Sequence, residues 1–146
     1  MLYFEDFAAG QVRDMGSHTF SEPDIVAFAR DYDPQRFHVD AAAAVDTPFG
    51  GLIASGWHTC CVLMRKMVDS YIGDSRCVGS PGLDSLKWLK PVRPGDRIRF
   101  RSTVLEARPS ASRPRLGLVR FRWEGVDTSG QSVVSLEGWQ LFDRKP

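Results

Sequence analysis

The sequence lacks the features that mark several common classes of protein. Its 146 residues include three cysteines and three histidines, and these form neither a disulfide framework nor a set with metal-ligand spacing. No apolar run is long enough to cross a membrane, and there is no Gly-x-Gly-x-x-Gly or P-loop motif. We therefore expect no metal, no nucleotide cofactor and no membrane partner.

The chain also lacks a large excess of positive or negative charge. The formal net charge is +1, which argues against a nucleic-acid-binding surface. Arginines do gather in the second half of the chain, where they alternate with apolar residues. This alternation favours strands with a charged solvent face, and a patch that attracts a phosphorylated ligand is the alternative. The first residues carry acidic groups where a secretory leader has basic ones, so we expect a cytoplasmic protein.

The first half of the chain predicts a strand over 11–20 and then three helices. Ser21 can cap a helix that carries Pro23 in its first turn, and this helix must stop by Asp33 because Pro34 follows. Asp40 can cap a short alanine-rich helix over 40–45.

The third predicted helix begins near Ser55 and continues to Ile72. It is apolar around most of its circumference, so we expect other structure to cover most of it. Cys60 and Cys61 lie inside this run and are expected to be buried and reduced.

The second half predicts strands separated by turns. An interrupted, glycine-rich segment covers 77–82, and about four antiparallel strands are expected, over 83–92, 97–108, 116–127 and 131–142. The resulting fold class is α+β, with helices on one face of an antiparallel sheet. The length and the lack of a linker predict one domain over residues 1–146.

Two segments carry the residues suited to catalysis. Asp33 and His38 stand five residues apart on a loop that contains Pro34, and together they offer an acid and a base. The glycine-rich segment 50–58 leads into the long helix, whose N-terminal amides can hold a carbonyl oxygen. By themselves, an Asp and a His near a proline are more typical of a surface turn, and Gly56 is typical of a helix start.

Four blocks of the sequence resemble the MaoC-like dehydratases: 33–40, 50–59, 79–84 and 88–96. They occur in the family's order and span nearly the whole chain. The resemblance implies a hotdog fold, in which a curved antiparallel sheet wraps around a long central helix. It implies an (R)-specific enoyl-CoA hydratase, or 3-hydroxyacyl-CoA dehydratase, of the kind used in fatty acid metabolism. Coenzyme A would be part of the substrate, and a homodimer would form the acyl tunnel at its interface.

The resemblance also assigns the catalytic pair. The family motif has the form Gly-Asp-x-Asn-Pro-x-His, and Asp33 and His38 occupy its Asp and His places. Gln35 stands where the family often has Asn, Arg36 where it often has Pro, and Tyr32 replaces the Gly. These departures keep the acid/base pair and change the segment that presents it.

The remaining site residues follow from the same resemblance. The amide of Gly56 would hold the thioester oxygen, and Ser55 takes the place of the family's His beside it. Ser55 is expected as the helix N-cap, with a thioester contact as the alternative. A second glycine-rich segment either lines the substrate tunnel or forms a β-bulge: Gly79, Ser80, Pro81 and Gly82.

Two other functions remain open at this stage. A thioesterase on the same fold would use the carboxylate to activate water at the carbonyl carbon. A non-catalytic subunit would bind the acyl thioester without reacting, and Arg36 in the loop favours that reading. The spacing of Asp33 and His38 favours the hydratase.

Overall fold

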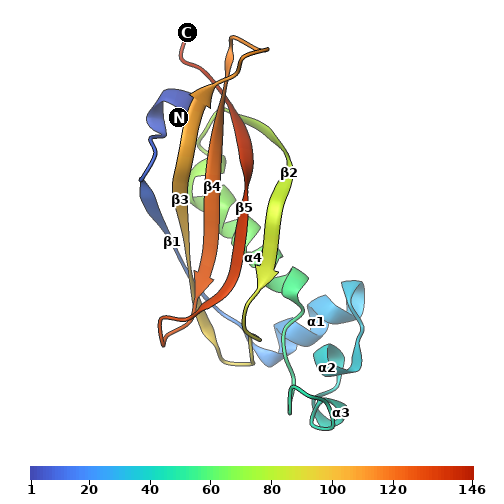
Figure 1. Cartoon of the computed structure of the whole chain (residues 1–146). Coiled ribbons are helices and arrows are strands. Elements are labelled where there is room, and N and C mark those ends of the chain that lie inside the picture. The colour runs from blue at the N-terminus through green and yellow to red at the C-terminus, as the bar shows by residue number, and fades with distance from the viewer.

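The computed structural model describes residues 1–146 and is built on a five-stranded antiparallel sheet with the order β1-β3-β4-β5-β2. Helix α4 lies behind this sheet, and α1, α2 and α3 gather beyond one of its ends (Figure 1). The strands are β1 (Val12–Thr19), β2 (Cys77–Trp88), β3 (Arg97–Pro109), β4 (Leu116–Val126) and β5 (Ser132–Asp143). The α+β class predicted from the sequence is confirmed.

The sheet has one apolar and one charged face because its central strands alternate. In β3, Ile98 and Phe100 are buried while the arginines between and beside them are exposed. In β4, Phe121 and Trp123 are buried on the same side. Since successive side chains of a strand point to opposite faces, this period of two predicts the core side of the sheet correctly.

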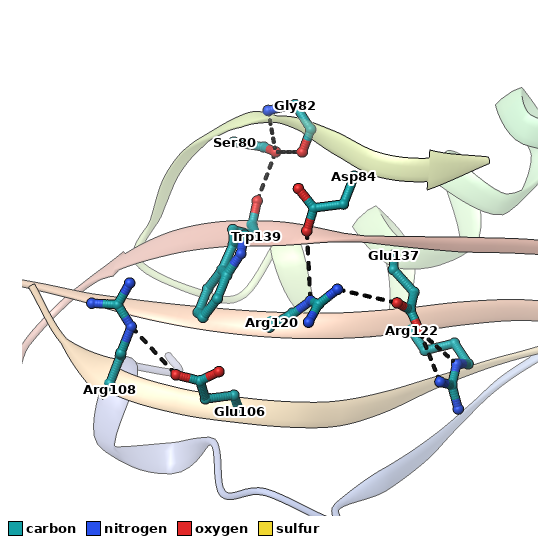
Figure 2. Close-up of polar contacts among 9 residues, drawn as sticks. All are labelled: Ser80, Gly82, Asp84, Glu106, Arg108, Arg120, Arg122, Glu137 and Trp139. Carbon is teal, nitrogen blue, oxygen red and sulfur yellow. Dashed lines mark hydrogen bonds and ion pairs between the residues drawn. The ribbon is translucent and has the colours of Figure 1, made fainter.

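The arginines occupy the outer face of the sheet, where acidic residues pair with them. Glu137 accepts from Arg120 at 3.2 Å and from Arg122 at 2.7 Å, and Asp84 lies 3.5 Å from Arg120 (Figure 2). Exposed pairs of this kind contribute little to stability individually. The alternating-strand interpretation is therefore correct for the arginines of β3 and β4, which lie on the face opposite the core.

Helix α4 (Gly56–Met67) continues as a π-helical segment over Val68–Ile72. Leu63, Met67 and Tyr71 are buried in the same core as the apolar face of the sheet. The predicted helix is thus confirmed, and no helix of the protein is both long and apolar enough to cross a membrane.

The expected coverage of this helix is only partly found. Trp57 and Met64 are 55% and 48% exposed, and Cys61 is exposed while Cys60 is partly buried. The prediction of two buried cysteines is therefore wrong for Cys61. The error arises because the apolar residues surround the helix, whereas this chain supplies a sheet for only one side of it.

Three short elements follow one another at the end of the sheet: α1 (Glu22–Tyr32), α2 (Arg36–Val39) and α3 (Ala41–Ala44). Ser21 caps α1 by accepting from the amide of Asp24 at 3.3 Å. Asp40 caps α3 by accepting from two amides. The predicted caps are confirmed, but α2 was expected as loop, because a single turn of helix has too few residues to show a period.

Strand β2 differs from its prediction. It runs without interruption from Cys77 to Trp88 and pairs with β5 through several register shifts. It is an edge strand of the sheet, and Val78 and Leu83 on it are about half exposed. The glycine and proline residues therefore bend and bulge one strand; they do not separate two.

A hydrogen-bonded network inside the core gives a first prediction. The buried Tyr71 hydroxyl donates to Gln140 at 2.9 Å and accepts from the Trp123 indole at 3.0 Å, and burial raises the pKa of Tyr71. Tyr71→Phe leaves both partners unpaired, so we expect a loss of about 1–3 kcal/mol in the free energy of unfolding. Urea denaturation measures it. Tyr32→Phe, at a residue that is 75% exposed, is the control and should change little.

Candidate active site

Asp33 and His38 lie close together at the end of the sheet. Asp33 is the C-cap of α1, where its amide donates to the carbonyl of Ala29 and Pro34 prevents another helical turn. His38 lies on α2 and is buried. The Asp33 Oδ2 and His38 Nε2 atoms are 3.3 Å apart. The side chains that the sequence singled out are therefore adjacent in space.

The backbone fixes the orientation of the His38 ring. Its Nδ1 lies 2.7 Å from the carbonyl oxygen of Ile53. A carbonyl can only accept, so Nδ1 carries a proton and donates it to Ile53. Nε2 is then the nitrogen that faces Asp33 and is available for proton transfer.

Both carboxylate oxygens of Asp33 are held. Gln35 donates its side-chain amide to Oδ1 at 2.7 Å, and the Ser55 hydroxyl donates to Oδ2 at 2.7 Å. Burial acts to raise the pKa of Asp33, but the hydrogen bonds from Gln35 and Ser55 and the nearby His38 outweigh it, so the pKa lies below its ordinary value. Asp33 is therefore ionised at neutral pH and is a fixed hydrogen-bond acceptor.

The start of α4 lies beside this carboxylate. Ser55 is the N-cap, and its hydroxyl accepts from the amide of Trp57 at 3.3 Å. The expectation of a cap is confirmed. Ser55 is fully buried and gives its proton to Asp33. The amide of Gly56 has no acceptor within the chain, and it lies at the positive end of the helix dipole.

These groups share a cavity of about 430 Å³. Asp33, His38 and Gly56 line it, while the rest of its wall is mainly aromatic and aliphatic. The other lining residues come from α2 and its N-cap, the approach to α4 and its first turn, the end of β2 with the segment after it, and the start of β5: Gln35, Phe37, Phe49, Ile53, Ala54, Trp57, Thr59, Trp88, Leu89, Lys90, Pro91, Val92 and Val133. An apolar hollow with a few converging polar groups is the usual form of a small-molecule site.

The packing of Trp88 on α4 requires that residue 56 has no side chain. A Cβ atom there would lie 2.4 Å from Cε2 and Nε1 of Trp88, so the indole rests directly on the first turn of α4. Trp88 also meets Trp57 edge to face, with ring centroids 5.1 Å apart. Gly56 is therefore required for packing at the cavity wall as well as being suited to a close approach by a ligand.

The glycine-rich segment on β2 lies away from this cavity. Gly79 and Gly82 both have φ of +135°, and the register with β5 shifts between them. The Ser80 hydroxyl donates to the carbonyl of Trp139 at 2.7 Å and accepts from the amide of Gly82 (Figure 2). Gly79, Ser80 and Pro81 line a separate hollow beside Ser110 and Arg113. Within one chain the segment is a bulge, and it does not reach Asp33.

Comparison with known protein families identifies the chain. The MaoC like domain family matches residues 6–119. This covers well over half of the sequence, and the chain belongs to that family. The resemblance drawn from the four sequence blocks is confirmed.

Similarity to individual proteins supports this assignment. The crystal structure of a MaoC-like dehydratase from Rhodospirillum rubrum superimposes with a TM-score of 0.92 at 37% identity, covering 100% of this chain and 99% of that one. The 3-hydroxybutyryl-CoA dehydratase of Methylorubrum extorquens is 30% identical over 141 residues, or 93% of this chain and 85% of its own length. A conserved hypothetical protein from Mycobacterium tuberculosis with a double hotdog fold superimposes with a TM-score of 0.76 at 22% identity, covering 99% of this chain and 45% of that one. The protein has the hotdog fold.

Sequence analysis missed two contributors to the site. The carbonyl of Ile53 orients His38, and a backbone group leaves no signal in the residue type. Trp88 was given no role at the site from the sequence, yet it is 47% exposed and covers Gly56. Its position at the end of an edge strand, just before a Pro-Gly turn region, was the available clue.

The contact between Gly56 and Trp88 gives the second prediction. Gly56→Ala forces the indole away from α4, so we expect a loss of stability of about 1–3 kcal/mol, typical of overpacking, and a change in tryptophan fluorescence. The fluorescence change should vanish in a Trp88→Phe background. Gly51→Ala is the matched control, because the nearest atom to its Cβ, Arg93 Nη1, is 3.7 Å away. An unchanged spectrum and midpoint for Gly56→Ala would contradict the packing.

Proposed function

We propose that the protein adds water to the 2,3-double bond of an enoyl-CoA thioester, or removes water from the corresponding (R)-3-hydroxyacyl-CoA. The observation that carries the proposal is that Asp33, His38 and the free amide of Gly56 line one cavity. The name of the Methylorubrum extorquens relative, 3-hydroxybutyryl-CoA dehydratase, supports the same reaction class. Coenzyme A enters as part of the substrate, and no metal or separate cofactor takes part.

The pair can hold and activate one water molecule. Ionised Asp33 accepts a hydrogen bond from that water, and Nε2 of His38 is placed to exchange a proton with it. The water oxygen bonds to C3 while the electrons of the double bond move toward the thioester oxygen. A proton originating from the water is then delivered to C2, so that one molecule of water is added in all.

The start of α4 suits the charge that develops during this step. Negative charge collects on the thioester oxygen, and the Gly56 amide together with the helix dipole can stabilise it. A preorganised donor of this kind typically lowers the barrier by roughly 3–4 kcal/mol. Because Gly56 has no Cβ, the thioester can approach the backbone closely.

Two other activities are separated from hydration by one assay. The protein is mixed with crotonyl-CoA, the absorbance of the conjugated thioester is followed, and a thiol reagent reports free coenzyme A. Loss of the conjugated band without free thiol supports hydration. Release of thiol indicates a thioesterase. Neither signal across a panel of acyl chain lengths and branches indicates a non-catalytic acyl-binding subunit.

The third prediction concerns the catalytic pair. Asp33→Asn removes the charge that holds the water, and His38→Ala removes the proton-transfer group. Each should lower kcat for crotonyl-CoA hydration by about 100-fold or more. Asp31→Asn, on the exposed surface of the same helix, is the matched control. Turnover near the wild-type rate in either pair variant, with folding verified by circular dichroism, would disprove the assigned roles.

We further propose that the enzyme is a homodimer in which the β2 strands of two copies pair edge to edge. The outer edge of β2 has no partner strand in one chain, and an exposed edge of this length invites pairing. An antiparallel pair sets the beginning of one strand beside the end of the other. Such a pair would bring the partner's segment 79–82 toward the Trp88 end of β2, which borders the cavity.

The fourth prediction tests this assembly. Light scattering should give about twice the mass of one chain for the wild type. Leu83→Glu places charges at the pairing edge, where they repel across the two-fold axis, and should shift the mass to that of a monomer. Val12→Glu alters an exposed residue on β1, at the opposite edge of the sheet, and should leave the dimer intact. Monomeric wild-type protein would refute the assembly.

A further inference from the structure

Five aromatic rings form a continuous ladder that ends one residue before Asp33 in the sequence. His18 on β1 meets Phe20 at 4.8 Å between ring centroids, and Phe20 meets His58 on α4 at 5.1 Å. His58 stacks on Phe28 of α1 at 4.8 Å with an interplanar angle of 10°, and Phe28 meets Tyr32 at 5.1 Å. We call these five residues the aromatic ladder. Asp33 is the next residue after Tyr32.

The two histidines of the ladder have no evident role in the chemistry. His58 is buried, and its Nδ1 has no hydrogen-bond partner. The Nε2 of His18 is also buried without a partner. An unpaired polar atom in the interior is costly, so the ladder retains two imidazoles where phenyl rings would pack at lower cost.

Helix α1 is the element that this contact holds. Ile25 and Ala29 anchor the helix in the core, and Phe28 carries the contact with His58 about one and a half turns before Asp33. Because His58 lies in the first turn of α4, the stack joins α1 to the helix end that carries Gly56.

Burial is the main factor that opposes protonation of the two histidines, and nearby positive charge adds to it. Burial lowers the pKa of His58, and His18 lowers it further. Burial also lowers the pKa of His18, and Lys66 adds to the effect. Asp24 on α1 acts in the opposite direction on both rings, but does not reverse either shift.

We propose that His58 is a positioning residue, whose stack on Phe28 sets Asp33 opposite Gly56 and is released when the His18–His58 pair takes up a proton. The effect on turnover rests on the proposed hydratase function, whereas the effect on α1 does not. The ladder thereby gives the site a dependence on pH that does not come from the catalytic pair.

The lowered pKa of His58 sets the direction in which stability changes with pH. A histidine that is kept neutral by the fold binds a proton more readily in the unfolded chain, whose histidines titrate near pH 6.5. The stabilisation that His58 provides is therefore complete above about pH 6.5. It is lost as the pH falls through the lower pKa of the folded state.

The fifth prediction uses two variants of His58. His58→Phe keeps the stack and cannot be protonated, whereas His58→Ala removes the stack. Hydrogen–deuterium exchange of the α1 amides, corrected for the intrinsic rate, is measured at about pH 7 and about pH 5, on either side of the ordinary histidine pKa. Protection in the wild type should fall at the lower pH. In His58→Phe it should fall by less than half as much.

Steady-state kinetics give the second readout. His58→Ala should lower kcat by about tenfold or more at neutral pH while KM stays within about threefold, as expected when a reacting group is displaced and binding is retained. His58→Phe should restore kcat to within about twofold of the wild type. Val119→Ala, in the fully buried core of β4, lowers stability without touching the ladder and should keep kcat.

The results separate the two proposals. A wild-type protein that turns over no thioester would refute the proposed function, and the exchange measurement would still decide the inference. Equal loss of α1 protection in the wild type and in His58→Phe would overturn the role of protonation. Wild-type kcat in His58→Ala would overturn the positioning role. If His58→Ala does not fold, the comparison of His58→Phe with the wild type remains decisive.

Discussion

The hydroxyl group of Ser55 connects the two parts of the candidate site. It donates to Asp33 and accepts from the first turn of α4, so the carboxylate and the helix end that carries Gly56 are held at one atom. Since a hydroxyl can donate only one proton, its direction is fixed by the carboxylate. The relative position of the Asp33–His38 pair and the Gly56 amide depends on this arrangement, and the rest of the candidate site is arranged around it.

The surrounding contacts act on the same three groups. Gln35 holds the second oxygen of Asp33, the carbonyl of Ile53 holds the ring of His38, and the indole of Trp88 covers Gly56. None of these partners needs to touch a reacting atom. Together they restrict the rotation of the Asp33 and His38 side chains and the space beside Gly56, and such restriction is the condition for efficient positioning of a bound molecule.

Much of the fold could be predicted from the sequence because its signals are local. Alternation predicts the faces of β3 and β4, and capping residues predict where α1 and α4 begin. The close pairing of Asp33 with His38 also followed from their spacing and from the family motif. The predictions failed where the answer depends on distant parts of the chain: Cys61 is exposed on α4, and β2 is continuous because β5 pairs with it across its bulges.

The chemistry-bearing groups come from one continuous stretch, from Asp33 to Gly56, whereas much of the cavity wall comes from Trp88 to Val92 and from Val133. The wall therefore combines residues of the stretch that carries these groups with residues of two distant stretches that carry none of them. Replacements between 89 and 92 can reshape the hollow without altering the order or spacing of these groups. A fold built in this way can acquire a new substrate range while it keeps one set of polar groups, because part of the cavity wall is encoded in other segments.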